Sequence, residues 1–203
     1  SWFVDKMLPE NFSKQLNGKN PFEKLNEKAV AIGQGKSGLL TLDWWNGVRT
    51  PYFRFDLGGA ILGLNIKTKP EQIWLSFLEA HAMNVRRCLR MFLDEGHAIN
   101  RIYATGGIAN KNPLLMQILS DVLQMEINVV KSHQTAALGS AIFGAAASEK
   151  YTFTDLAERM HSKVTQTYTP NKCQLYDRLF SAYCRLADEH QLGMELLTEL
   201  ADK

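Results

Sequence analysis

The residues best suited to ligand binding lie between Thr105 and Pro113, where the sequence reads Thr-Gly-Gly-Ile-Ala-Asn-Lys-Asn-Pro. Two adjacent glycines leave the backbone bare, so a flat ring can lie directly on the chain at Gly106 and Gly107. Asn112 is placed to cap a following helix, and a helix start favours an anionic or hydrogen-bonding ligand. A tight strand-to-helix turn with an ordinary cap explains the same residues, and the pattern alone leaves both interpretations open.

A second glycine pattern, Gly33-Gln34-Gly35-Lys36-Ser37-Gly38, matches the GxGxxG spacing of dinucleotide sites. In those sites the glycines follow a strand and open a helix, which places the phosphate at the helix N-terminus. Here they follow an expected helix and precede an expected strand, so the order is reversed. The end of the pattern also resembles a phosphate-binding P-loop, but that motif needs a glycine where Val30 stands. We therefore interpret this segment as a flexible turn.

Acidic residues offer three candidates for a catalytic base: Asp43 at the end of an expected strand, Asp56 in a turn-like segment and Asp121 on an amphipathic helix. We assign none of them as catalytic. The histidines are scattered without metal-ligand spacing, so we expect no metal site.

Cysteine usage bears on the cellular compartment. The three cysteines are Cys88, Cys173 and Cys184. They are odd in number and widely spaced, which argues against a disulfide framework or a zinc site. Cys88 lies in a helical apolar pattern, where a buried small side chain is expected. A reducing cytoplasm fits this usage best.

Composition places the chain among ordinary globular proteins. It has 203 residues, of which 45% are hydrophobic and 22% charged, and this is enough for one domain with a core or for one domain with an appendage. The formal net charge of +2 is too small to indicate a nucleic acid or membrane surface as partner. We recognise no signal peptide and no apolar run long enough to span a bilayer.

The glycine turn at residues 105–113 needs elements to position it, and hydrophobic periodicity predicts them. We expect helices at residues 22–32, 69–95, about 113–122 and 135–147, and strands at residues 38–45, 99–104 and 126–130. This alternation of strand and helix is typical of an α/β layer arrangement. Residues 151–203 are expected to form a helical extension packed on the α/β part. Residues 1–16 resemble the end of a preceding element.

Four segments occur in the order found in one protein family. They are residues 49–52, 56–64 with a continuation to Glu79, 103–122 and 134–141. Together they resemble the C-terminal domain of the FGGY carbohydrate kinases, over nearly the whole chain. Phe77 departs from the pattern, because the family signature usually has a smaller residue there.

The resemblance implies an actin-like, hexokinase-like ATPase fold of the ribonuclease H-like type, with a helical C-terminal tail. Residues 1–150 would be a partial, nucleotide-binding FGGY domain and residues 151–203 its helical extension. By the same resemblance, the adenosine-binding residues would be Gly106, Gly107, Asn110 and Asn112. The sugar site, the catalytic aspartate and most phosphate contacts would lie upstream of this chain, so the catalytic half is expected to be missing. The substrates of the intact enzyme would be ATP with Mg²⁺ and a sugar.

Within the family, residues 40–50 and Tyr168-Thr169-Pro170 resemble the ribulokinases, which convert L-ribulose to L-ribulose 5-phosphate in arabinose catabolism. Xylulokinase or another FGGY sugar kinase remains an alternative, and so does a non-catalytic interaction module of the same fold. Expected partners are the sugar, the nucleotide, the protein's own N-terminal domain and a second copy in a homodimer. We expect residues 1–16 and 38–45 to be buried against one of the last two, since Trp2, Phe3 and Leu8 would otherwise face water.

Overall fold

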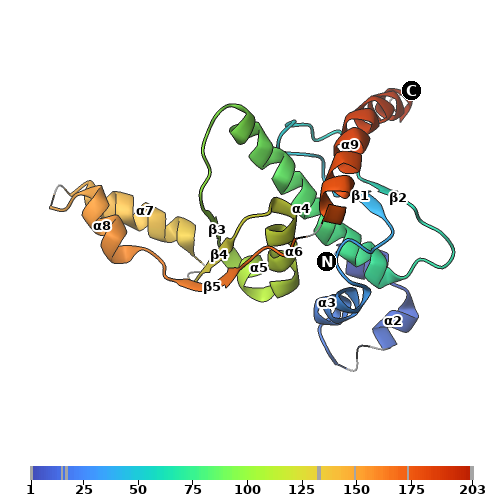
Figure 1. Ribbon diagram of the computed structural model, residues 1–203, viewed down its shortest axis with the longest axis horizontal. Helices are drawn as coiled ribbons and strands as arrows, with labels where there is room; N and C mark the ends of the chain where they lie inside the picture. Colours follow the sequence, from blue (N-terminus) through green and yellow to red (C-terminus); the bar gives the residue numbers. More distant parts are fainter. Residues whose placement is uncertain are drawn as a thin grey trace. The chain divides into compact units, whose positions relative to one another are not determined.

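The computed structural model describes residues 2–14, 16, 18–131, 134–148, 150–172 and 174–201, so Cys173 lies outside the described residues. The chain divides into two compact units (Figure 1). The first joins residues 1–98 to residues 172–203, and the second holds residues 99–171. None of the described helices is both long and apolar enough to cross a lipid bilayer.

The first unit packs helices around a two-stranded hairpin. Its helices are α1 (Trp2–Lys6), α2 (Glu10–Lys14), α3 (Pro21–Ile32), α4 (Pro70–Asp94) and α9 (Gln174–Ala201). The hairpin pairs β1 (Leu40–Leu42) antiparallel with β2 (Ala60–Leu62). The strand expected at residues 38–45 is therefore present, but shorter.

Helix α4 forms where the hydrophobic periodicity predicts it. Pro70 is its first residue, a position where the missing N–H of proline costs nothing. The chain leaves the helix at Gly96, whose φ of +85° is rarely adopted by residues with a side chain. Every residue from 75 to 80 is buried, so α4 is the central helix of this unit's core.

The N-terminal segment is covered in part by its own chain. Phe3 is only 5% exposed and packs with Leu25 and Phe77, the latter at 5.1 Å between ring centroids. The expectation that these apolar residues need a second copy or domain to cover them is thus wrong for Phe3. The sequence could not show that Leu25 and Phe77, remote along the chain, would reach it. Trp2 remains 47% exposed and stacks on Trp45 at 5.4 Å.

Adjacent tryptophans take opposite environments, as the alternation of side chains along an extended segment predicts. Trp44 is 2% exposed and contacts Tyr52 edge to face at 5.8 Å, whereas Trp45 is 38% exposed. The 38–45 segment therefore also contributes to the core of the first unit.

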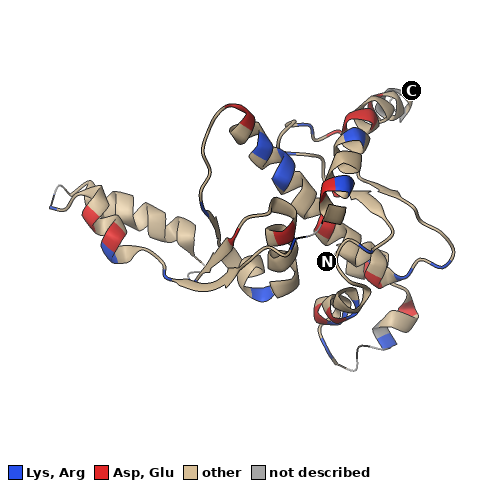
Figure 2. Ribbon diagram, viewed as in Figure 1, with Lys and Arg blue, Asp and Glu red and all other residues tan. Residues whose placement is uncertain are grey.

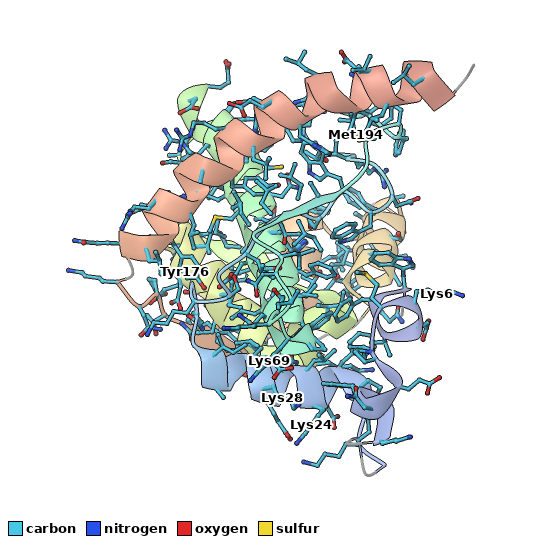
Figure 3. All side chains as sticks on the ribbon, turned by 90° about the vertical axis from the view of Figure 1, so that its right-hand side faces the viewer. Lys6, Lys24, Lys28, Lys69, Tyr176 and Met194 are labelled. Carbon is cyan, nitrogen blue, oxygen red and sulfur yellow. The ribbon has the colours of Figure 1, made fainter. Side chains whose placement is uncertain are left out.

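Helix α9 docks on α4 through an apolar face that the sequence pattern predicts. Its fully or nearly buried side chains are Tyr176, Phe180, Tyr183 and Ala187. Arg86 and Arg87 of α4 add ion pairs to Asp177 and Asp188, each at 2.6 Å. Burying an aromatic side chain contributes roughly 1.5–3 kcal/mol, whereas an exposed ion pair contributes about 1 kcal/mol or less, so apolar burial dominates. Figure 3 labels Tyr176 and Met194 near the two ends of this helix.

The turn at residues 33–38 is held by one buried carboxylate. The backbone N–H of Gly35 donates to Glu79 Oε1 at 2.6 Å, and Ser37 Oγ donates to Oε2 at 2.9 Å. The hydroxyl of Tyr176 in α9 also donates to Oε1, at 3.4 Å. Burial raises the pKa of Glu79 to about 7, against the opposing effect of these three donors. The expected turn is present, and Glu79 ties it to α4 and α9.

The second unit is built on a three-stranded sheet ordered β3-β4-β5. Its strands are β3 (Ile102–Ala104), β4 (Ile127–Val130) and β5 (Val164–Tyr168), and its helices are α5 (Gly106–Lys111), α6 (Pro113–Leu123), α7 (Thr135–Ala146) and α8 (Phe153–Met160). β3 and β4 are parallel and are joined through α5 and α6. This is the strand-helix-strand alternation that the sequence predicts.

Residues 164–168 depart from the expected helical extension. They form β5, which pairs antiparallel with β4. The β-branched residues Val164, Thr165 and Thr167 favour this strand, and Thr167 Oγ1 donates to Asn128 Oδ1 of the neighbouring strand at 2.9 Å. Because β5 completes the sheet of the second unit, the division between compact units does not fall at residue 150. The C-terminal helix itself is present as α9.

Asp121 has a structural role that its helical pattern does not reveal. It is 1% exposed on α6 and accepts hydrogen bonds from the backbone N–H of Asn171 at 2.7 Å and from Gln117 Nε2 at 2.8 Å. A buried carboxylate needs such donors to offset its desolvation. Asp121 therefore fastens the chain that leaves β5 to α6.

Candidate functional site

The Gly106-Gly107 turn leaves space above the backbone. It directly follows β3 and opens α5, with Thr105 as the preceding cap residue. Gly106 has a φ of +88°, in the left-handed region that favours glycine. A Cβ placed on Gly106 or on Gly107 would meet no atom within 4 Å. The turn is thus open enough for a ring to approach the backbone.

The two asparagines of the predicted site shape the turn. Asn110 Nδ2 donates to the carbonyl of Gly106 at 2.9 Å, which braces the turn from within. Asn112 Oδ1 accepts from the backbone N–H of Leu115 at 3.1 Å, so Asn112 caps α6 as the sequence predicts. Direct contact of either asparagine with a ligand stays a prediction.

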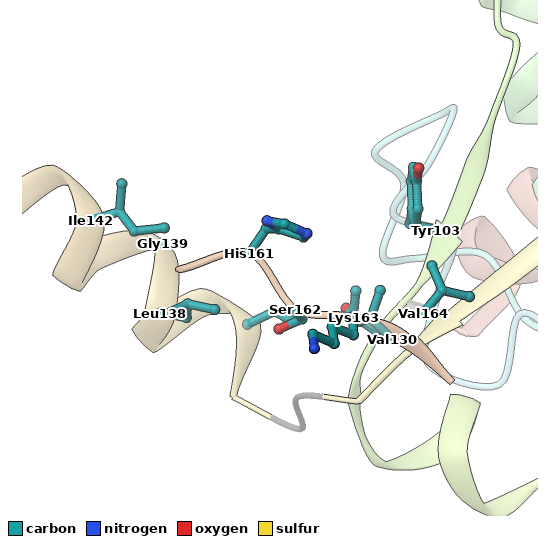
Figure 4. Close-up of a pocket in the computed structure, with 11 residues that line it drawn as sticks. Tyr103, Val130, Leu138, Gly139, Ile142, His161, Ser162, Lys163 and Val164 are labelled. Carbon is teal, nitrogen blue, oxygen red and sulfur yellow. The ribbon is translucent and has the colours of Figure 1, made fainter. Parts of the chain in front are cut away.

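A pocket of about 600 Å³ lies next to this turn (Figure 4). Thr105, the residue before the turn, lines the pocket, whereas none of the predicted site residues Gly106, Gly107, Asn110 and Asn112 does. It is lined by Tyr103, Thr105, Val130, Thr135, Leu138, Gly139, Ile142, His161, Ser162, Lys163 and Val164. Its volume is in the range typical of small-molecule sites. Every lining residue belongs to the second unit.

The pocket lies where parallel α/β sheets usually bind ligands, outside the carboxyl ends of the strands. Thr105 follows β3 directly, and Val130 is the last residue of β4. The chain enters α7 at Thr135. A hydroxyl at a helix start is usually a cap, but here the cap residue is Gln134, without a side-chain capping bond, and Thr135 lines the pocket.

The lining combines an apolar surface with a few polar groups. Val130, Leu138, Ile142 and Val164 supply apolar area, and Gly139 keeps α7 thin. Helix α7 carries no charged residue (Figure 2). Lys163 is the cation among the described lining residues, and none of these is Asp or Glu. Such a pocket suits a ligand with a flat apolar part and an anionic or hydroxyl-bearing part.

Two of the aspartates considered as bases lie away from this pocket. Asp56 accepts two bonds from Arg54, at 2.8 and 2.6 Å. Asp43 Oδ2 lies 3.7 Å from His81 Nδ1, and the buried Oδ1 of Asp43 has no hydrogen-bond partner among the described residues. The Arg54 guanidinium lowers the pKa of Asp56 to about 2. Both belong to the first unit. No group of three or more His, Cys, Asp or Glu among the described residues is placed to hold a metal ion.

A family model described as the C-terminal domain of the FGGY family of carbohydrate kinases matches residues 2–148. The chain belongs to the FGGY family. This confirms the resemblance drawn from the ordered motifs. The match ends before α8 and β5, so residues 161–164 of the pocket lie outside it.

Curated relatives of this FGGY chain include ribulokinases. The ribulokinase of Bacillus licheniformis is 40% identical over 194 residues, covering 91% of this chain and 35% of the relative. That of Halalkalibacterium halodurans is 40% identical over 197 residues, covering 93% and 35%. The chain thus spans about a third of the length of these relatives.

Among solved structures, xylulose kinase from Rhodospirillum rubrum superposes with a TM-score of 0.75 at 24% identity, covering 92% of this chain and 38% of that one. At 24% sequence identity, this structural similarity establishes the fold alone. It confirms the expected actin-like, ribonuclease H-like ATPase fold of the FGGY kinases.

Proposed function

We propose that this chain supplies the adenosine-binding part of a kinase that transfers the γ-phosphate of ATP to a ketopentose. The favoured sugar is L-ribulose, and the product would be L-ribulose 5-phosphate, an intermediate of arabinose catabolism in the cytoplasm. The observation that carries the proposal is the open Gly106-Gly107 turn beside a pocket at the carboxyl ends of β3 and β4. Because the chain belongs to a family of carbohydrate kinases, a nucleotide bound there would be the ATP that donates the phosphate.

The pocket's residues fit adenosine and leave the phosphoryl transfer to other groups. The apolar side chains of the pocket, with the open Gly106-Gly107 turn next to it, suit the adenine ring. Thr105, Thr135 and Ser162 offer hydroxyls for the ribose. Transfer itself depends on positioning, on charge neutralisation and on an aspartate that takes the hydroxyl proton. When bound, Mg²⁺ would neutralise phosphate charge, and the described residues provide no cluster for it. We therefore expect the base and the magnesium ligands outside this chain.

The ribulokinase relatives and residues 40–50 favour L-ribulose over related sugars. In the structure this segment runs from β1 into a loop built around Trp44. A Cβ on Gly47 would lie 2.5 Å from the Cα of Phe55, so the loop is too tight there for a side chain. Xylulokinase remains the alternative, since a solved xylulose kinase shares the fold. The partners would be an N-terminal domain and a second copy, with Trp2 and Trp45 still exposed for either.

Substrate preference tests the proposed function. When the chain is joined to the remaining part of an FGGY kinase, the complete protein should phosphorylate L-ribulose. Its kcat/KM for L-ribulose should be at least about tenfold above that for D-xylulose or glycerol. A site that hydrogen-bonds one hydroxyl pattern leaves polar groups unpaired with another, and this discriminates strongly. Steady-state kinetics with the three substrates give the comparison. A higher kcat/KM for D-xylulose or glycerol would keep the family and remove the ribulokinase proposal.

A further inference from the structure

One wall of the pocket comes from outside the family-model match. Residues 161–164 line it, whereas the match ends at residue 148 (Figure 4). Figure 4 shows His161 between the side chains of α7 and Tyr103, with Ser162 and Lys163 following along the same wall. This wall adds polar and cationic groups to a surface that is otherwise mostly apolar and neutral.

The position of this wall is fixed by backbone pairing. The N–H of Lys131, just after β4, donates to the carbonyl of Lys163 at 2.9 Å. Val164 then pairs with Val130 as β5 begins. Both contacts hold residues 161–164 beside the carboxyl end of β4, where the pocket opens.

His161 is oriented by a hydrogen bond of its own ring. Its Nδ1 lies 2.6 Å from the carbonyl oxygen of Glu158, at the end of α8. A carbonyl can only accept, so Nδ1 carries the hydrogen and donates it. In the neutral ring, Nε2 is then the nitrogen with a lone pair, available to accept a hydrogen bond from a ligand.

Lys163 sets the electrostatic preference of the pocket. Its ammonium is the cation among the described lining residues, and no Asp or Glu lines the pocket to balance it. An ammonium beside a neutral, partly apolar surface favours a ligand with a phosphate group over an uncharged one.

We propose that His161 and Lys163 bind the same adenine nucleotide as the Gly106-Gly107 turn. Lys163 Nζ pairs with its phosphate groups, and His161 Nε2 accepts a hydrogen bond from an N–H or O–H of its adenosine part. The inference rests on the proposed function, because it assigns two further residues to that site. Nucleotide recognition would then include His161 and Lys163, which lie beyond the residues that the family model matches.

Titration of the isotope-labelled 203-residue chain with ADP and with adenosine, followed by amide chemical shifts, tests the assignment. Lys163→Ala should raise the Kd for ADP roughly fivefold, the equivalent of one ion pair, and leave the Kd for adenosine unchanged. His161→Ala should weaken both ligands. Lys131→Ala removes an equal charge from an exposed residue that does not line the pocket, and it should change neither Kd.

The outcomes separate this inference from the proposed function. If Lys163→Ala and His161→Ala bind ADP like the unchanged chain, while Gly107→Val does not bind, the inference is overturned and the proposed function stands. If ADP shifts no amide of residues 99–171 in the unchanged chain, both are overturned. A loss of ADP affinity in Lys131→Ala equal to that in Lys163→Ala would show a general charge effect and also overturn the role of Lys163.

Discussion

The 203-residue chain, mixed with ATP, Mg²⁺ and L-ribulose, is expected to form no sugar phosphate above the uncatalysed rate. Phosphoryl transfer needs a positioned base and groups that neutralise the phosphates. No carboxylate lines the described pocket, and the chain spans about 35% of its ribulokinase relatives. Kinases typically gain a factor of about 10⁶ or more over the uncatalysed reaction, so the loss should be complete in practice.

Product formation is best followed by phosphorus NMR over hours, with an active FGGY kinase as positive control. The same preparation should give dispersed amide signals, which shows that inactivity does not come from unfolding. Turnover at about 1 per second or faster would contradict the proposal that the catalytic groups lie outside this chain.

Glu79→Gln should remove a pH dependence from the stability of the chain. Burial raises the pKa of Glu79 from 4.5 to about 7. Between these values the folded state keeps a proton that the unfolded state releases, so the contribution of this group to the free energy of unfolding falls as pH rises. At about 1.4 kcal/mol per pKa unit, the fall amounts to about 3 kcal/mol between pH 4.5 and 7, and it levels off above pH 7.

Urea unfolding at several pH values measures this effect as the difference between the unchanged chain and Glu79→Gln. The variant replaces one of the two acceptor oxygens by an NH₂ donor, so either Gly35 or Ser37 loses its acceptor at every pH. The slope of the difference, rather than its size, is therefore diagnostic. Glu10→Gln, the same change at an exposed position, controls for the lost charge. Parallel curves for Glu79→Gln and the unchanged chain would contradict the assignment.

Periodicity predicts the elements whose side chains bury a continuous stripe. α4, α6 and α7 lie close to their expected bounds, and β3 and β4 are both shorter than the expected strands. Asn112 could be identified as a cap because the signal is local: an asparagine directly before Pro113 and an apolar run. The opposite environments of Trp44 and Trp45 follow in the same way from neighbouring positions.

The features that the sequence does not predict depend on partners far along the chain. Helix α5 begins with Gly106 and Gly107, which have low helix propensity, so the segment looks like a plain turn. β5 is largely exposed and has no buried stripe, and only its pairing with β4 makes it a strand. The pocket wall at residues 161–164 depends on that same pairing. Glu79 belongs to the family signature, but its contacts with Gly35 and Ser37 appear only in the fold.

Calorimetric titration with ADP of the unchanged chain, Gly107→Val and Gly144→Val tests the central claim most directly. Each glycine has open space around it and no positive φ, so the fold should accept either valine. Only Gly107 belongs to the proposed site. The account predicts that Gly144→Val binds ADP like the unchanged chain, while Gly107→Val binds at least about tenfold more weakly because valine fills the space of the adenosine. Equal ADP affinity of all three would contradict the account and place any nucleotide site elsewhere.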